Sequence, residues 1–189
     1  MRRLLLTGAA ALLLASCGQG TTDNQAAAGN DSETNAGVTP GAPSQNLSAL
    51  LGATPRLGQL VKAAGMEKVF DGKAPYTVLA PTDAALDKLP AGSFDGLDKP
   101  ERKAEVTALL RGHILPGTIL AADLERAVES GKGKATIATM TGEPLTITRD
   151  GDGLKVTGKN GQSARIVGTE QPASNGVVHT IDTVLAPAG

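Results

Sequence analysis

The chain has 189 residues, of which 40% are apolar and 2% aromatic, with 24 Gly, 11 Pro and one Cys. This length suits one modest domain plus additional segments, because single domains commonly span about 100 to 150 residues. A lone cysteine excludes an internal disulfide and a cysteine-based zinc site. With two His, one Tyr, two Phe and no Trp, we expect no metal, no cofactor and no aromatic platform for sugars or bases.

The charge balance excludes another class of partner. Residues 47–189 hold 16 basic and 16 acidic side chains, and the chain without Arg2 and Arg3 holds 16 basic and 19 acidic ones. A balanced domain lacks the clustered positive field that binds a phosphate backbone. Nucleic acid is therefore not an expected partner.

Residues 1–17 have the composition of a targeting segment. Two arginines precede an apolar stretch from Leu4 to Leu14, and small residues then lead to Cys17. The stretch is too short to span a bilayer, so we predict a signal peptide. The sequence LASC that ends at Cys17 resembles the lipobox of bacterial lipoproteins, which implies cleavage before Cys17 and lipid attachment to it. An ordinary secretory signal with an incidental cysteine is the alternative.

The residues after Cys17 extend this interpretation. In such lipoproteins an Asp at the next position indicates retention in the inner membrane, and this chain has Gly18. The resemblance therefore implies a bacterial cell envelope protein, lipid-anchored in the outer membrane, with its domain in the periplasm or at the cell surface. Residues 18–46 are mostly small and polar and cannot bury enough apolar surface to order themselves, so we predict a disordered tether. The domain is predicted to span residues 47–187.

The first half of the domain has helical patterning. Helix starts are indicated by Thr54 before Pro55, by a capping box of Asp98 and Glu101, and by Asp123 as an N-cap. The predicted helices, in chain order, cover about residues 55–64, 66–70, 82–89, 99–111 and 124–128. Between the second and third of these helices, Tyr76 to Ala80 forms a predicted strand.

The second half is patterned as strands. Apolar residues alternate with polar ones around Leu145 and Ile147 and again around Leu154 and Val156, with Asp150–Gly153 between them. That connecting segment begins like a calcium loop but lacks the later acidic ligands, so we predict a hairpin turn. Further strands are predicted over 164–167 and 177–185, while Lys132 and Lys134 are expected in a solvated turn. Helices followed by antiparallel hairpins indicate an α+β fold.

Three segments resemble the fasciclin-like (FAS1) domain family. They are TVLAPTDAAL at Thr77–Leu86, the first signature of the family; LLRGHILPG at Leu109–Gly117, the central segment around the family histidine; and NGVVHTIDTVLAP at Asn175–Pro187, the second signature. The resemblance covers about residues 46–187. It implies a wedge-shaped β-sandwich flanked by short helices, in a secreted or surface-anchored module that binds partners and has no established catalysis.

The signature residues are predicted to serve mainly the fold. They are Thr77, Pro81, Thr82, Asp83, His113, Asn175, Gly176, His179 and Asp182. Pro81 is expected to end a buried strand, and Thr82 or Asp83 to cap the helix after it. His113 and His179 fall in phase with apolar neighbours, so we interpret both as hydrogen-bonded core residues, with a pH-sensitive contact as the alternative.

Two departures from the family pattern affect the functional prediction. Adhesive animal members often carry Tyr before the central histidine, and this chain has Gly112; some carry an acid followed by Ile where this chain has Glu170 and Gln171. Integrin-type adhesion is therefore not expected. We predict a non-enzymatic module for adhesion, or for contact with an envelope or extracellular protein or polysaccharide. The alternative is a carrier of an apolar small molecule, such as a lipid or carotenoid, held between sheet and helices.

Overall fold

The computed structural model describes residues 43–89 and 99–185. The predicted signal peptide with Cys17, residues 18–42 of the predicted tether, and Asp98 lie outside these residues. Asn46, at the end of the predicted tether, is the N-cap of the first helix and accepts a 2.9 Å hydrogen bond from the backbone N–H of Ala49.

The helices are short, and several begin at a recognisable cap. In chain order they are α1 (Leu47–Gly52), α2 (Pro55–Ala64), α3 (Glu67–Asp71), α4 (Asp83–Asp87), the 3₁₀ helix η1 (Pro100–Arg102), α5 (Lys103–Gly112) and α6 (Ala121–Ser130). Pro55 occupies the first position of α2, where its missing N–H costs nothing. Gly65 ends α2 in the left-handed conformation, with φ of 68°, which glycine adopts without steric penalty.

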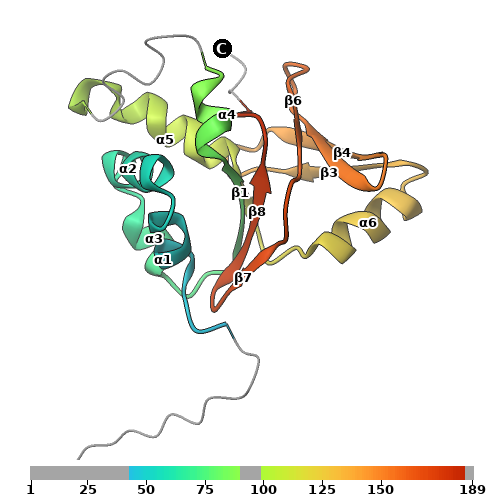
Figure 1. The fold of residues 1–189 in the computed structure, drawn as a ribbon, viewed down its shortest axis with the longest axis horizontal. Coiled ribbons are helices and arrows are strands. Elements are labelled where there is room, and N and C mark those ends of the chain that lie inside the picture. Colours follow the sequence, from blue (N-terminus) through green and yellow to red (C-terminus); the bar gives the residue numbers. More distant parts are fainter. Residues whose placement is uncertain (1–42, 90–98, 186–189) are drawn as a thin grey trace, which may run out of the picture. The chain divides into compact units, whose positions relative to one another are not determined.

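Sheet A contains the two signature strands side by side. Its strand order is β2-β1-β8-β7, with bounds β1 (Tyr76–Pro81), β2 (Ile114–Pro116), β7 (Gln171–Ala173) and β8 (Gly176–Ile181). The central pair β1 and β8 is parallel and in register from Tyr76 opposite Gly176 to Pro81 opposite Ile181, while both outer pairs are antiparallel. The parallel pairing thus joins segments that lie far apart in the sequence (Figure 1).

Sheet B is an antiparallel meander. Its strands, in the order β3-β4-β5-β6, are β3 (Lys134–Ala138), β4 (Pro144–Asp150), β5 (Gly153–Thr157) and β6 (Ser163–Arg165). Helix α6 packs against β3 and β4, whereas α1 lies against sheet A (Figure 1). The sheet therefore has the period-2 burial expected for strands with one face on a core, seen most clearly in β5.

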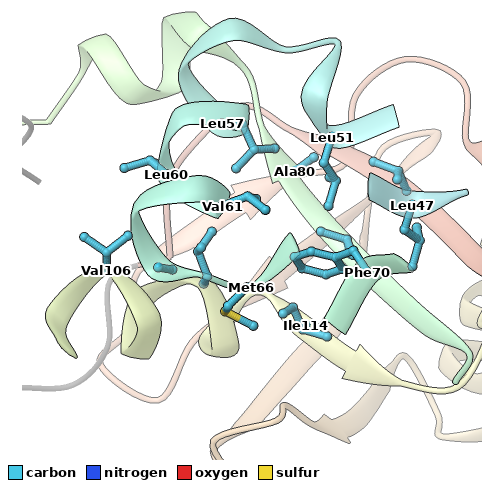
Figure 2. Packing of buried hydrophobic residues seen from close by; sticks show 14 of the residues in the cluster. Leu47, Leu51, Leu57, Leu60, Val61, Met66, Phe70, Ala80, Val106 and Ile114 are labelled. Atoms are coloured by element: carbon cyan, nitrogen blue, oxygen red, sulfur yellow. The ribbon is translucent and has the colours of Figure 1, made fainter. Parts of the chain in front are cut away.

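The first core lies between the helices and one face of sheet A. Figure 2 shows Leu57, Leu60 and Val61 of α2 packed near Val106 of α5 and Phe70 of α3. All five side chains are buried. Removal of such a side chain to Ala commonly costs about 2 to 5 kcal/mol, so this cluster is the main source of stability for the helical layer.

The second core fills the space between the two sheets. Leu79, Leu115 and Ile181 of sheet A pack with side chains of sheet B and of α6, and each of the three is at most 1% exposed. Successive residues of a strand point to opposite faces, so Leu79 belongs to this core while Val78 and Ala80 belong to the first. The α+β fold predicted from the sequence is confirmed.

Two helix starts differ from the prediction. The segment expected as one helix from Lys99 is the 3₁₀ turn η1 followed by α5, because Lys103 N–H bonds to the carbonyl of Pro100, three residues back. Asp123 does not cap α6. The cap is Leu120, and the Asp123 carboxylate lies one turn inside and accepts a 3.1 Å hydrogen bond from the Leu120 N–H.

The strand predictions were incomplete. The short strands β2 and β7 were not expected, and Lys134, predicted in a turn, is the first residue of β3; Lys132 does lie in a turn, with φ of 57°. Strand β8 ends at Ile181, so Leu185 lies beyond the strand that was expected to contain it, although it is buried. These strands are defined by partners distant in sequence, which a local pattern does not reveal.

Candidate functional site

The end of strand β1, in the first signature, is held by a hydrogen bond to the second signature. The backbone N–H of Thr82 donates to the carbonyl of Ile181 at 3.0 Å, so the chain leaves β1 still attached to β8. Pro81 closes β1, and the Thr82 hydroxyl accepts a 3.0 Å hydrogen bond from the Ala85 N–H as the N-cap of α4. The structure thus makes Thr82 the cap, rather than Asp83.

Asn175 connects β8 to the helical layer. Its side-chain oxygen accepts from the Leu47 N–H at 2.8 Å, and its side-chain nitrogen donates to the carbonyls of Phe70 and Gly72, both at 2.7 Å. The amide therefore uses both of its hydrogens and one oxygen lone pair inside the fold. One side chain ties α1, the end of α3 and the turn before β8 together.

Gly176 allows two strands to approach closely. A Cβ atom at this position would lie 2.0 Å from the carbonyl oxygen of Tyr76 and 2.8 Å from a methyl carbon of Leu47. No real side chain fits at those distances without movement of the β1 backbone. The glycine of the second signature is therefore required by the packing of β8 on β1.

Thr77 and Asp182 anchor loops to the sheets. The buried Thr77 hydroxyl donates to the carbonyl of Gly117 and accepts from the Ile119 N–H, both at 2.8 Å. The Asp182 carboxylate accepts from the Arg165 N–H at 2.8 Å and from the Thr183 hydroxyl at 3.1 Å. These side chains fix the course of the loop after β2 and of the segment after β8.

His113 is buried and holds its proton on Nδ1. Its Nε2 accepts a 3.0 Å hydrogen bond from the Leu185 N–H, so Nδ1 must carry the hydrogen that bonds the Leu109 carbonyl at 2.8 Å. Burial lowers the pKa of His113 below its ordinary value of 6.5, and the hydrogen bond to Leu109 opposes this only in part. The ring is neutral near pH 7, and both nitrogens bond to backbone groups.

His179 lies in the other core, between the sheets. Its Nε2 donates to the Ile119 carbonyl at 2.8 Å, and its Nδ1 is buried without a hydrogen-bond partner. The residue is 0% exposed. Neither His113 nor His179 therefore lies in a cleft from which it could accept a proton from a substrate.

A surface cleft opens beside the ends of strands β1 and β8, within the two signatures. It has a volume of about 270 Å³, and we call it the signature cleft. Its lining residues come from both signatures and from the helices and strand around them, namely Leu50, Leu51, Thr54, Ala80, Pro81, Thr82, Asp83, Gln171, Val178 and Thr180. Of the signature residues that the sequence singled out, Pro81, Thr82 and Asp83 meet here.

Several polar groups of the signature cleft have no partner within residues 43–89 and 99–185. Oδ1 of Asp83 is buried without a hydrogen bond, and Thr54 makes no side-chain capping bond to α2 although it occupies the N-cap position. Because native proteins pair nearly all buried polar groups, an unpaired carboxylate oxygen calls for an explanation. Thr54, Gln171 and Thr180 were not expected as site residues. For Thr180, the one available signal was strand alternation, which turns its side chain to the other face of β8 from that of His179.

Two other predicted functional features are accounted for inside the fold. The Glu170 carboxylate, at the position of the adhesive acid in some animal members, accepts a 2.8 Å hydrogen bond from the Ala121 N–H at the start of α6. The apolar void lined by Leu57, Phe70 and His113, among others, has a volume of only about 10 Å³. That volume holds one water molecule at most, so this void does not accommodate a lipid or carotenoid.

Across residues 43–89 and 99–185, no three His, Cys, Asp or Glu side chains gather as metal ligands would. In the same ranges, no helix combines the length and apolar character needed to cross a bilayer.

The fold and these signatures agree with comparisons to known proteins. The fasciclin domain model matches residues 53–187, and the chain belongs to this family. It is 37% identical over 127 residues to Protein sll1483 of Synechocystis sp., covering 67% of this chain and 63% of that protein. It is 33% identical over 128 residues to the pig transforming growth factor-beta-induced protein ig-h3, covering 67% of this chain but 17% of that protein. The chain thus spans less than two thirds of either relative.

A solved structure shows the same fold. A FAS1 domain pair from the insect cell adhesion molecule fasciclin I superposes with a TM-score of 0.66 at 15% identity, covering 77% of this chain and 52% of that one. At this identity the likeness concerns the arrangement of helices and sheets.

Proposed function

We propose that this chain is a non-enzymatic binding module, anchored at the bacterial cell envelope, that contacts a partner protein through the signature cleft. The observation that carries this proposal is a contrast within the signatures. Asn175, Thr77 and Asp182 use their polar atoms inside the fold, whereas the signature cleft keeps polar groups that have no partner among residues 43–89 and 99–185. Unused polar groups in a concave surface are what a ligand needs for orientation.

The interior histidines argue for binding over catalysis. A general base or nucleophile has to reach the atom it attacks or the proton it takes. His113 and His179 are at most 3% exposed, and their hydrogen bonds go to backbone groups. A protein described as a cell adhesion molecule shares this fold, which supports a role in contact between surfaces.

The anchor is inferred from the sequence around Cys17. Several acyl chains on one residue hold a protein at a membrane far more firmly than a single chain. Growth of the cells with labelled palmitate should label the chain, and Cys17→Ala should abolish the label. Label retained by Cys17→Ala would overturn the anchor without affecting the cleft.

The binding function is tested by blocking the cleft in cells. Deletion of the chain should reduce cell aggregation or biofilm, and the full chain should restore it. Thr180→Tyr, which fills the cleft, should not restore it, whereas Thr136→Tyr on the exposed face of β3 should. Restoration by Thr180→Tyr, with normal amounts of folded protein, would overturn the proposal.

A further inference from the structure

We infer that the signature cleft receives a basic side chain, lysine or arginine, from the partner polypeptide, with Asp83 as its counter-ion. This inference rests on the proposed function and names the chemistry of the partner. It follows from the charge, the shape and the unused hydrogen-bonding groups of the cleft.

The charge of the cleft is set by Asp83. The nine other lining residues are apolar, hydroxyl or amide side chains, so the described part of the chain gives the cleft one carboxylate and no cation. The nearby Arg56 of α2 is already paired with Asp87, one turn further along α4 from Asp83. The Asp83 carboxylate therefore lacks a cationic partner from α2, and an incoming ammonium or guanidinium group would supply one.

The unpaired oxygen indicates what is missing. Oδ1 of Asp83 is buried and makes no hydrogen bond to residues 43–89 or 99–185, although the residue as a whole is partly exposed. An ionised carboxylate is an acceptor only, so its partner must be a donor. The terminal torsion of Asp is broad, so rotation can turn either oxygen toward a donor in the cleft.

The shape of the cleft suits a long side chain. Its volume of about 270 Å³ far exceeds the volume of about 10 Å³ of the apolar void and leaves room for a side chain. Leu50, Pro81 and Val178 give it apolar walls, against which the methylene groups of lysine or arginine can lie while the charged end meets a polar group.

The remaining polar groups fit the same ligand. The hydroxyls of Thr54 and Thr180 and the amide of Gln171 line the cleft, and none of the three side chains hydrogen-bonds to the described part of the chain. Their oxygens can accept the remaining hydrogens of an ammonium or guanidinium group.

Other ligand classes fit less well. A phosphate or carboxylate would meet the Asp83 charge with no cation to offset it. A sugar ring would find no aromatic side chain among the lining residues. A purely apolar group would leave the carboxylate unpaired and desolvated.

The test uses the full chain carrying Cys17→Ser, labelled with ¹⁵N and titrated with short acetylated peptides. The peptides are identical except for a central Lys, Arg, norleucine or Glu. We expect the Lys and Arg peptides to shift the amide signals of Thr54, Thr82 and Thr180, and to bind at least tenfold more tightly than the norleucine and Glu peptides. The affinity of the Lys and Arg peptides should fall as salt is added, because the ion pair between Asp83 and the basic side chain would be partly exposed to solvent.

Two variants complete the design. Asp83→Asn should weaken the Lys and Arg peptides at least fivefold, while Asp152→Asn in an exposed turn should leave their affinity unchanged. Equal binding of the norleucine peptide, an unchanged affinity of Asp83→Asn, or shifts confined to another surface would each overturn the inference. If Asp83→Asn restores aggregation to the deletion strain while Thr180→Tyr does not, the proposed binding function is supported and the inference of a basic side chain is overturned. If both variants restore aggregation, the proposed binding function is overturned as well.

Discussion

The backbone N–H of Leu185 donates a hydrogen bond to Nε2 of His113, with 3.0 Å between the two nitrogens. This bond attaches the last described residue to the end of α5, because His113 is the C-cap of that helix. Leu185 packs in the core between the sheets and Val184 in the helical core. The central histidine of the family therefore holds the segment after β8 against the end of α5 through this hydrogen bond.

The first prediction concerns pH. The pKa of His113 is lower in the folded chain than in the unfolded chain, so both states are neutral above about pH 6.5. Below that pH the unfolded chain binds a proton that the folded chain does not, and the stability falls as the pH falls. As the pH is lowered from 7.5 to 5.5, we expect this histidine to decrease the free energy of unfolding by up to about 1.4 kcal/mol, as measured by urea unfolding.

The control for this prediction is His113→Asn. The variant should be less stable at pH 7.5, because the Leu185 N–H and the packing of the ring are both disturbed. Its stability should change less between pH 7.5 and 5.5 than that of the wild type, since the titrating group is gone. An equal pH dependence in both proteins would show that the loss arises elsewhere.

The second prediction concerns Asn175. Asn175→Ala removes three hydrogen bonds at once and leaves the Leu47 N–H and two carbonyls without their partner. We expect a loss of about 3 kcal/mol in urea unfolding, because each unpaired buried group costs about 1 to 3 kcal/mol. Asn160→Ala also removes hydrogen bonding, including that from the Gln162 N–H, but in an exposed turn between β5 and β6, so it should cost less than about 1 kcal/mol. Similar losses in the two variants would contradict the linking role of Asn175.

The helix caps show how far local sequence determines this fold. Pro55 and Gly65 bound α2 as predicted, because a missing N–H and a left-handed residue act on their own segment. The start of α6 was not predictable in this way. Its first N–H is bonded by Glu170, 49 residues further along the chain, so the cap depends on the tertiary fold.

The signature cleft likewise depends on contacts between segments that are distant in the sequence. The sequence identified Pro81, Thr82 and Asp83 from one continuous segment, whereas Thr54 and Thr180 come from other elements. The parallel register of β1 and β8, with Ala80 opposite Thr180, places Thr180 beside the first signature, and the packing of α2 adds Thr54. The register between two strands about 100 residues apart cannot be predicted from the local sequence pattern of either strand.

The third prediction compares two glycines. Gly176→Ala would place its Cβ 2.0 Å from the carbonyl oxygen of Tyr76, so β1 and β8 must separate. We expect a loss of more than about 3 kcal/mol or failure to fold, as overpacking against rigid backbone is costly. Gly112→Ala meets no atom within 4 Å and lies at the end of α5, so it should stabilise the fold by about 0.5 kcal/mol. Thermal unfolding of both variants separates them, and a well-folded Gly176→Ala would show that the close approach is not needed.

The fourth prediction compares two buried threonine hydroxyls. Thr77 bridges the Gly117 carbonyl and the Ile119 N–H, while the buried hydroxyl of Thr148 on β4 has no partner. Valine keeps the shape of threonine and removes the hydroxyl in both cases. Thr77→Val should cost about 1 to 3 kcal/mol, because two buried backbone groups lose their partner. Thr148→Val should be neutral or stabilising by up to about 1 kcal/mol, because it removes a buried hydroxyl that has no partner in the described part of the chain. Urea unfolding with an unchanged m-value would measure both effects, and a destabilised Thr148→Val would mean that its hydroxyl has a partner in solution.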